Sequence, residues 1–194
     1  MSQEIEIEFK NLLTKEEFLQ IQQFFDFKPE DFHVQINHYF DTADFYLKDN
    51  GCALRIREKN GRFELTLKQP APTGLLETSQ TLSASEAKEV METNLLPKGP
   101  VKGAVDQLSE DVEGFLYFGS LTTERAEKNY QGGLVVLDHS SYLNTADYEI
   151  EFEVAEEKKG QEVFESLLQQ LKIPIRKTDN KIMRFYKRKY DIGT

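Results

Sequence analysis

The sequence contains a single cysteine, Cys52, among its 194 residues, and this scarcity excludes an internal disulfide. No apolar run approaches the roughly 20 residues that a membrane-spanning helix needs. The N-terminal residues lack the basic and apolar regions of a signal peptide. We therefore expect a cytoplasmic protein that has no membrane partner.

Positive charge is also in short supply, since 24 Lys and Arg residues face 34 Asp and Glu residues, for a formal net charge of −10. This balance argues against broad binding to nucleic acid. It leaves a small polyanionic ligand open, because the field in a cleft depends on the local arrangement of charges. The 39% of hydrophobic and 30% of charged residues are typical of a globular chain, and the length suits one domain over residues 1–194.

Charged and apolar residues alternate in several short segments, and a period of two predicts strands with one charged face. A single strand of this kind is ordinary in an antiparallel sheet that shows one face to water. Here each charged face is dominated by one sign, which solvent exposure does not require, because neighbouring like charges repel. The residues on these faces are Glu4, Glu6, Glu8 and Lys10, then Arg55 and Arg57, then Glu149, Glu151 and Glu153.

Other segments complete a mixed set of elements. Capping-box patterns open helices at Thr14 and at Ser83, and Asn60-Gly61 marks a hairpin turn. Further strands are predicted at 34–40, 63–68, 75–82, 115–127 and 133–142, and further helices at 104–111, 161–171 and 179–189. Closing the strands into a barrel turns the charged faces inward and lets helices cover the apolar outer faces.

Such an interior would hold both carboxylates and basic groups. Carboxylates that converge from different strands suit Mg²⁺ or Mn²⁺ better than zinc. Arginine offers a forked donor that matches phosphate oxygens, and lysine adds a point charge. A metal combined with such cations forms a clamp for a chain of phosphates, and it stabilises the charge that develops in phosphoryl transfer.

The run Glu6-Ile7-Glu8-Phe9-Lys10 resembles the Glu-x-Glu-x-Lys signature of the CYTH, or triphosphate tunnel metalloenzyme, superfamily. Further matches follow in the family's order across nearly the whole chain. They are Asn37 to Thr42, Leu54-Arg55-Ile56-Arg57, Thr66-Leu67-Lys68, Arg125, Leu137-Asp138, Tyr148-Glu149-Ile150-Glu151, and Lys181 with Arg184. The resemblance implies an α+β fold, with an eight-stranded antiparallel tunnel, outer helices, and hydrolysis or cyclisation of triphosphates with a divalent metal.

The resemblance also implies roles for individual residues. The implied catalytic residues are Glu6, Glu8, Lys10, Glu149 and Glu151, and the implied metal ligands are Glu6, Glu8, Asp138, Glu149 and Glu151. The implied phosphate ligands are Lys10, Arg55, Arg57, Lys68, Arg125, Lys181 and Arg184. Lys181 and Arg184 lie one helical turn apart, so a solvated helix face is the alternative for them. Asn144 stands where relatives often have glycine, and the implied pattern assigns no role to Glu77.

Three functions are compatible with these features of the sequence. The first is a metal-dependent triphosphatase, acting as a monomer or homodimer on a small-molecule triphosphate. The second is an adenylyl cyclase of the same fold, which would need a nucleoside pocket. The third is a non-catalytic module that senses triphosphate or polyphosphate, against which the second acidic strand argues, because capture of an anion needs no carboxylates.

Overall fold

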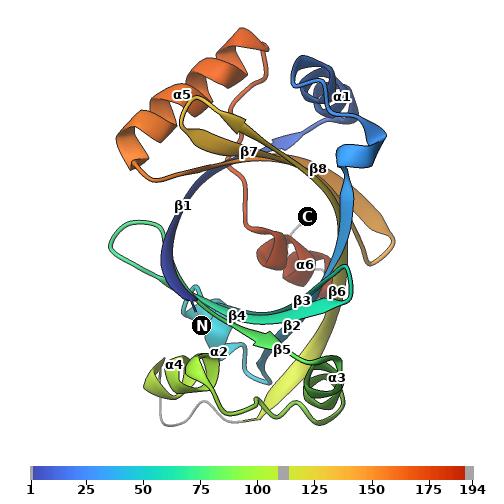
Figure 1. Cartoon of the computed structure of the whole chain (residues 1–194), viewed down its shortest axis with the longest axis vertical. Coiled ribbons are helices and arrows are strands. Elements are labelled where there is room, and N and C mark those ends of the chain that lie inside the picture. The colour runs from blue at the N-terminus through green and yellow to red at the C-terminus, as the bar shows by residue number, and fades with distance from the viewer. Residues whose placement is uncertain (1, 109–113, 191–194) are drawn as a thin grey trace. The chain divides into compact units, whose positions relative to one another are not determined.

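The eight strands of the computed structural model form a closed antiparallel barrel in the order β1-β5-β4-β3-β2-β6-β7-β8 (Figure 1). The structure describes residues 2–108 and 114–190. The predicted eight-stranded α+β fold is confirmed. The strands are β1 (Ser2–Leu13), β2 (His33–Thr42), β3 (Ala53–Lys59), β4 (Arg62–Pro70), β5 (Leu75–Leu82), β6 (Phe115–Tyr130), β7 (Gly133–Tyr142) and β8 (Thr145–Val154).

Six α-helices accompany the strands in the described part of the chain. None of them is both long and apolar enough to span a membrane. Chain contacts divide the fold into two compact units. The described residues of Met1–Ile5 and Gln35–Leu121 form unit 1, and those of Glu6–Val34 and Thr122–Thr194 form unit 2. The helices are α1 (Lys15–Phe24), α2 (Tyr46–Asp49), α3 (Ala84–Thr93), α4 (Pro100–Leu108), α5 (Glu157–Gln170) and α6 (Lys181–Tyr190).

In unit 1, strands β3, β4 and β5 form an antiparallel meander. The predicted hairpin turn between β3 and β4 is confirmed, because Asn60 and Gly61 have φ angles of 52° and 70°, the left-handed values that a two-residue hairpin favours. Helices α3 and α4 lie beside β4 and β5 (Figure 1) and close a core over their apolar face. Its buried members include Leu54, Ile56, Leu65, Leu67, Val90 and Val105.

Two segments of unit 1 differ from the prediction. The helix predicted at 104–111 begins at Pro100, whose fixed φ suits a first helical turn, and residues 109–111 lie outside the described chain. The turn-rich link after β2 contains the one-turn helix α2. The buried carboxylate of Asp41 organises this link, because it accepts hydrogen bonds from the backbone N–H groups of Thr42, Leu47 and Lys48 at 2.8, 2.8 and 3.0 Å.

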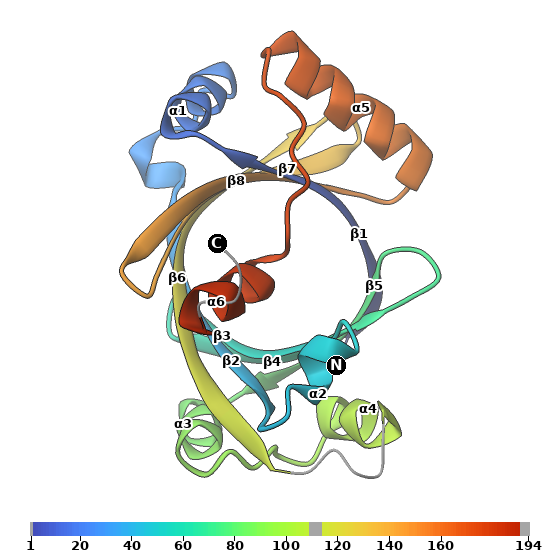
Figure 2. The same ribbon diagram turned by 180° about the vertical axis from the view of Figure 1, so that it is seen from behind.

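In unit 2, β8 pairs antiparallel with both β1 and β7. Asn144 has a φ of 61° in the tight turn between β7 and β8, which agrees with the tolerance of asparagine for left-handed backbone. Helices α1 and α5 lie over the apolar face of these strands (Figure 2). The core beneath them includes Ile21, Val135, Leu137, Ile150, Phe152, Phe164 and Leu168.

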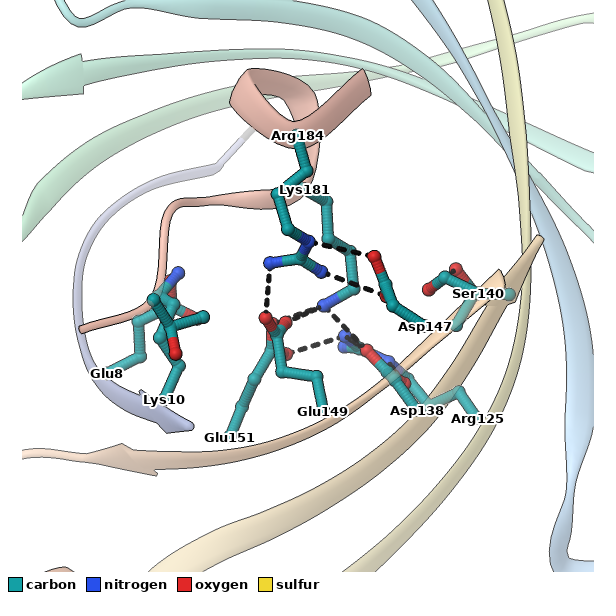
Figure 3. Close-up of polar contacts among 12 residues, drawn as sticks. Glu8, Lys10, Arg125, Asp138, Ser140, Asp147, Glu149, Glu151, Lys181 and Arg184 are labelled. Atoms are coloured by element: carbon teal, nitrogen blue, oxygen red, sulfur yellow. Dashed lines mark hydrogen bonds and ion pairs between the residues drawn. The ribbon is translucent and has the colours of Figure 1, made fainter. Parts of the chain in front are cut away.

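The segment between α5 and α6, residues 172–180, is fixed to β1 and is called the strap below. Asn11, with no exposed surface, donates to the Pro174 carbonyl at 3.1 Å and accepts from the Arg176 N–H at 2.6 Å. The Leu12 N–H donates to Thr178 Oγ1 at 2.9 Å. The strap therefore sets where α6 begins. Unlike the predicted outer helices, α6 packs against the charged face of β8 (Figure 3).

Candidate active site

Three carboxylates of unit 2 converge on adjacent strands β7 and β8. Asp138 lies directly opposite Glu149 in the strand register, and Glu151 follows two residues later on the same face. Each side chain offers an oxygen, and these oxygens lie within 4.8 Å of one another. All three residues are buried. This group, called the triad below, brings together three of the predicted metal ligands.

Arg125 donates hydrogen bonds to two carboxylates of the triad. It stands on β6 directly opposite Asp138, and its guanidinium donates from Nε to Asp138 Oδ1 at 2.8 Å and from Nη2 to Asp138 Oδ2 at 2.6 Å. The same Nη2 donates to Glu151 Oε2 at 2.7 Å. The prediction assigns this arginine to phosphate, whereas its donors here hold two carboxylates of the triad in place.

Lys181 enters the triad from the first turn of α6. Its Nζ lies 2.8 Å from Asp138 Oδ2 and also contacts the carboxylates of Glu149 and Glu151 (Figure 3). The alternative of a solvated helix face is therefore wrong for this residue. The ammonium group occupies the space among the three carboxylates, which is where a bound cation would be expected.

Arg184, one turn further along α6, extends the network. Its Nη1 donates to Glu149 Oε2 at 2.6 Å, and its Nε donates to Asp147 Oδ2 at 2.9 Å. The Tyr142 hydroxyl also donates to Asp147, at 2.8 Å. Asp147 is absent from the predicted site. Its position two residues before Glu149, on the same strand face, was the available signal.

Burial and the surrounding charges shift the pKa values of the two glutamates of the triad in opposite directions. Burial raises the pKa of Glu149 to about 7, against the attraction of Lys181 and with help from the nearby Glu151 carboxylate. Burial also opposes ionisation of Glu151, but Lys181 and Arg125 hold its pKa well below its usual range. Burial would lower the pKa of Lys181, yet the three carboxylates raise it well above its usual value. The carboxylates therefore favour the charged form of Lys181, whereas burial favours the protonated form of Glu149.

The predicted residues of β1 lie beside the triad rather than within it. Lys10 is directly opposite Glu151 in the strand register and forms an ion pair with Glu8. Burial would lower the pKa of Lys10, but Glu8, Glu151 and Glu149 raise it. Within the described ranges, the metal-capable group comprises the triad alone, so the structure does not bring Glu6 and Glu8 into it.

Glu153 continues the acidic face beyond the triad. It stands directly opposite Glu8, and its carboxylate lies 4.0 Å from Arg125 Nη1. Burial raises the pKa of Glu153 to about 7; Arg125 offsets part of this rise, and Glu6, Glu151 and Glu8 add to it. The end of β8 therefore concentrates more negative charge than Arg125 balances.

Unit 1 carries its own polar face, with the predicted phosphate ligands of β3 and β4. Arg57 donates from Nε to Asn37 Oδ1 at 3.2 Å. Lys68 forms an ion pair with Glu77, which lies directly opposite it on β5, so the structure supplies the partner that the prediction did not assign. Arg55 Nε is buried and has no hydrogen-bond partner among the described residues. A buried donor of this kind is costly unless a ligand satisfies it.

The donor set of the triad fits a hard divalent cation. All three groups are carboxylates, and oxygen ligands suit Mg²⁺ and Mn²⁺, whereas zinc favours nitrogen and sulfur. The three oxygens are already close enough to share one ion. Arg125 and Arg184 fix the outer oxygens of the triad, which is the supporting role that hydrogen bonds around metal ligands play.

Comparison with known proteins gives a consistent set of relatives. The family model for the CYTH domain matches residues 4–186. The chain is 56% identical over 189 residues to "Putative triphosphatase YjbK" of Bacillus subtilis (strain 168), covering 97% of this chain and 98% of the relative.

Two solved structures extend this set. A crystal structure from Bacillus halodurans, described as "a putative adenylate cyclase", is 47% identical with a TM-score of 0.92, over 96% of this chain and 100% of the other. A structure of HpAC1 from Hippeastrum is 25% identical with a TM-score of 0.77, over 94% and 96% of the two chains. HpAC1 is described as a putative adenylyl cyclase with a dominant triphosphatase activity.

Proposed function

Because the chain belongs to the CYTH domain family, we propose that it is a metal-dependent triphosphatase that hydrolyses a small-molecule triphosphate and acts as one domain over residues 1–194. The observation that carries this proposal is the buried triad, whose carboxylates fit Mg²⁺ or Mn²⁺. The triphosphatase descriptions of YjbK and HpAC1 support the same reaction class.

We assign binding of the phosphate chain to the basic residues of the polar faces. Arg55 and Arg57 are forked donors that match phosphate oxygens, and Lys68 adds a point charge. The unsatisfied, buried Nε of Arg55 gains a partner when a phosphate oxygen arrives. Within unit 2, Lys10, Lys181 and Arg184 are proposed phosphate ligands, and Arg125 acts mainly by holding the triad.

The reaction is attack of water on the terminal phosphorus. The bond from that phosphorus to the bridging oxygen breaks, and inorganic phosphate and a diphosphate leave. A metal bound at the triad would neutralise phosphate charge and position the water. Glu149 is the proposed residue that orients this water or accepts its proton, because its carboxylate belongs to the triad that would hold the metal. Glu6 and Glu8 are proposed to support metal binding from β1.

A substrate panel tests this proposal. Purified protein should release phosphate from tripolyphosphate with Mg²⁺ or Mn²⁺, and a chelator should stop the release. The panel also includes thiamine triphosphate and ATP, so that it covers triphosphates with and without an organic group. Absence of metal-dependent turnover on every member would refute the enzymatic proposal. The Bacillus halodurans relative, described as a putative adenylate cyclase, makes cyclisation the second candidate, and formation of cyclic AMP from ATP would establish it.

Arg57→Ala tests the assignment of phosphate binding. Loss of a charge-assisted contact of about 1.5–3 kcal/mol should raise KM by roughly 10-fold to 100-fold and leave kcat within about threefold, if Arg57 binds ground and transition states equally. Arg62→Ala is the matched control, because Arg62 is an exposed arginine on the same hairpin. An unchanged KM for Arg57→Ala would remove this residue from the binding set.

A further inference from the structure

The ammonium of Lys181 stands where the three carboxylates of the triad could share a metal ion (Figure 3). We propose that Lys181 is an internal cation that competes with the divalent metal, so that metal enters the triad only when α6 withdraws this side chain. The inference rests on the proposed metal site. It assigns Lys181 a role in the metal-free protein, distinct from its proposed contact with phosphate.

Distances exclude simultaneous occupation of the triad. Lys181 Nζ lies 2.8 Å from Asp138 Oδ2 and also contacts Glu149 and Glu151. Mg²⁺ binds carboxylate oxygens at about 2.0–2.1 Å. An ion held by the same oxygens would therefore fall almost on the nitrogen atom, and two like charges at such separation repel strongly. Metal and ammonium are alternatives at one position.

The surrounding charges make the exchange favourable once Lys181 leaves. Arg125 stays bonded to Asp138 and Glu151 from β6, so these two members of the triad keep their place when Lys181 withdraws. The carboxylate oxygens that Lys181 contacted then lack a cation, and a divalent ion supplies one more positive charge than the ammonium did. This added charge also favours a polyanionic substrate near the site.

The strap defines which part of the chain moves. Asn11 and Leu12 of β1 bind Pro174, Arg176 and Thr178, so the strap stays in place up to Thr178. Beyond it, Lys181 and Arg184 hold α6 through their contacts with β7 and β8. The buried side chains of Phe185 and Tyr186 also hold it, and Phe185 contacts Tyr142 on β7. We therefore place the pivot at residues 179–180, with α6 loosening as Lys181 gives up the triad.

Titration of the substrate-free protein with Mn²⁺, followed by the electron paramagnetic resonance signal of the free ion, tests the competition. Lys181→Met removes the charge and keeps much of the side-chain length, so we expect it to bind Mn²⁺ about tenfold more tightly or better, within the usual range of coupling between sites. Lys187→Met is the matched control, because Lys187 lies on the same helix but pairs with Asp179 outside the triad. Equal or weaker binding by Lys181→Met would overturn the inference.

A second measurement uses the wild-type protein and needs no variant to fold. Hydrogen–deuterium exchange should rise in residues 181–190 when Mn²⁺ is added, while residues 172–178 of the strap stay protected. Unchanged or slower exchange in α6 would contradict the proposed exchange of cations. Phosphate release by the wild-type protein separates the two proposals. Wild-type turnover without tighter Mn²⁺ binding by Lys181→Met refutes the competition alone, and tighter binding by the variant without wild-type turnover refutes the triphosphatase alone.

Discussion

Removal of the Arg125 guanidinium should be among the most destabilising single changes in this chain. Arg125→Met deletes three donors to Asp138 and Glu151, both of which are buried. Lys181 and Arg184 remain, but Arg184 contacts Glu149 and not the two carboxylates that Arg125 held. Breaking a buried ion pair on one side costs about 3–5 kcal/mol, mostly because it strands the partner charges. For a chain of this size, that corresponds to a fall in Tm of about 6 to 20 °C.

Thermal and urea unfolding of the metal-free protein measure this effect. Arg188→Met is the matched control, because Arg188 is exposed on α6, and its loss should cost less than about 0.5 kcal/mol. The double variant Arg125→Met with Asp138→Asn should be more stable than Arg125→Met, because it removes one stranded carboxylate. If Arg125→Met loses less than about 1 kcal/mol, the guanidinium does not hold the triad as described.

Two further predictions concern the strap and the acidic end of β8. Asn11→Ala should lower the free energy of unfolding in urea by about 1–3 kcal/mol, because it removes the hydrogen bonds of Asn11 to the Pro174 carbonyl and the Arg176 N–H. The exposed Asn129→Ala should change it little. Glu153 has a folded pKa of about 7 against 4.5 as the reference, so its ionisation opposes folding and stability falls as pH rises between these values. With chelator present, Glu153→Gln should therefore be more stable than wild type above pH 7, by about 1–2 kcal/mol after allowance for partial exposure. Near the reference pKa the two proteins should be nearly equal in stability. An equal gain in stability at both pH values would contradict the raised pKa.

Alternation of polar and apolar residues was sufficient to predict the strands and several of their ends. The bounds of β5 and β7 agree with the prediction, because each strand has a polar turn or a helix cap at its limits. Helix α5 begins at Glu157, four residues before the predicted start at 161. Its first turn is exposed apart from Gly160, where an added Cβ would approach Val154 Cγ2 to 2.5 Å, and no apolar periodicity signals such a turn.

The sequence predicted which residues belong to the candidate site better than it predicted the contacts between them. A strand's alternation identifies which side chains share a face, so Glu149 and Glu151 could be grouped from the sequence. The docking of α6 depends on bonds such as that of Asn11 to Pro174, which lie 163 residues apart. No local pattern encodes such a pairing. The sequence therefore left open that Lys181 and Arg184 face the carboxylates of β7 and β8.

The position of Lys181 has a consequence for how this protein matures. Some small domains need a metal ion to compensate their buried charge, and they fold only when this ion binds. Here Lys181, together with Arg125 and Arg184, already supplies positive charge to the three carboxylates, so the proposed exchange would let the chain fold before the ion arrives. Under the proposed exchange, metal loading would be a late and reversible event governed by the ion's concentration, and the folded chain would persist when the ion is depleted.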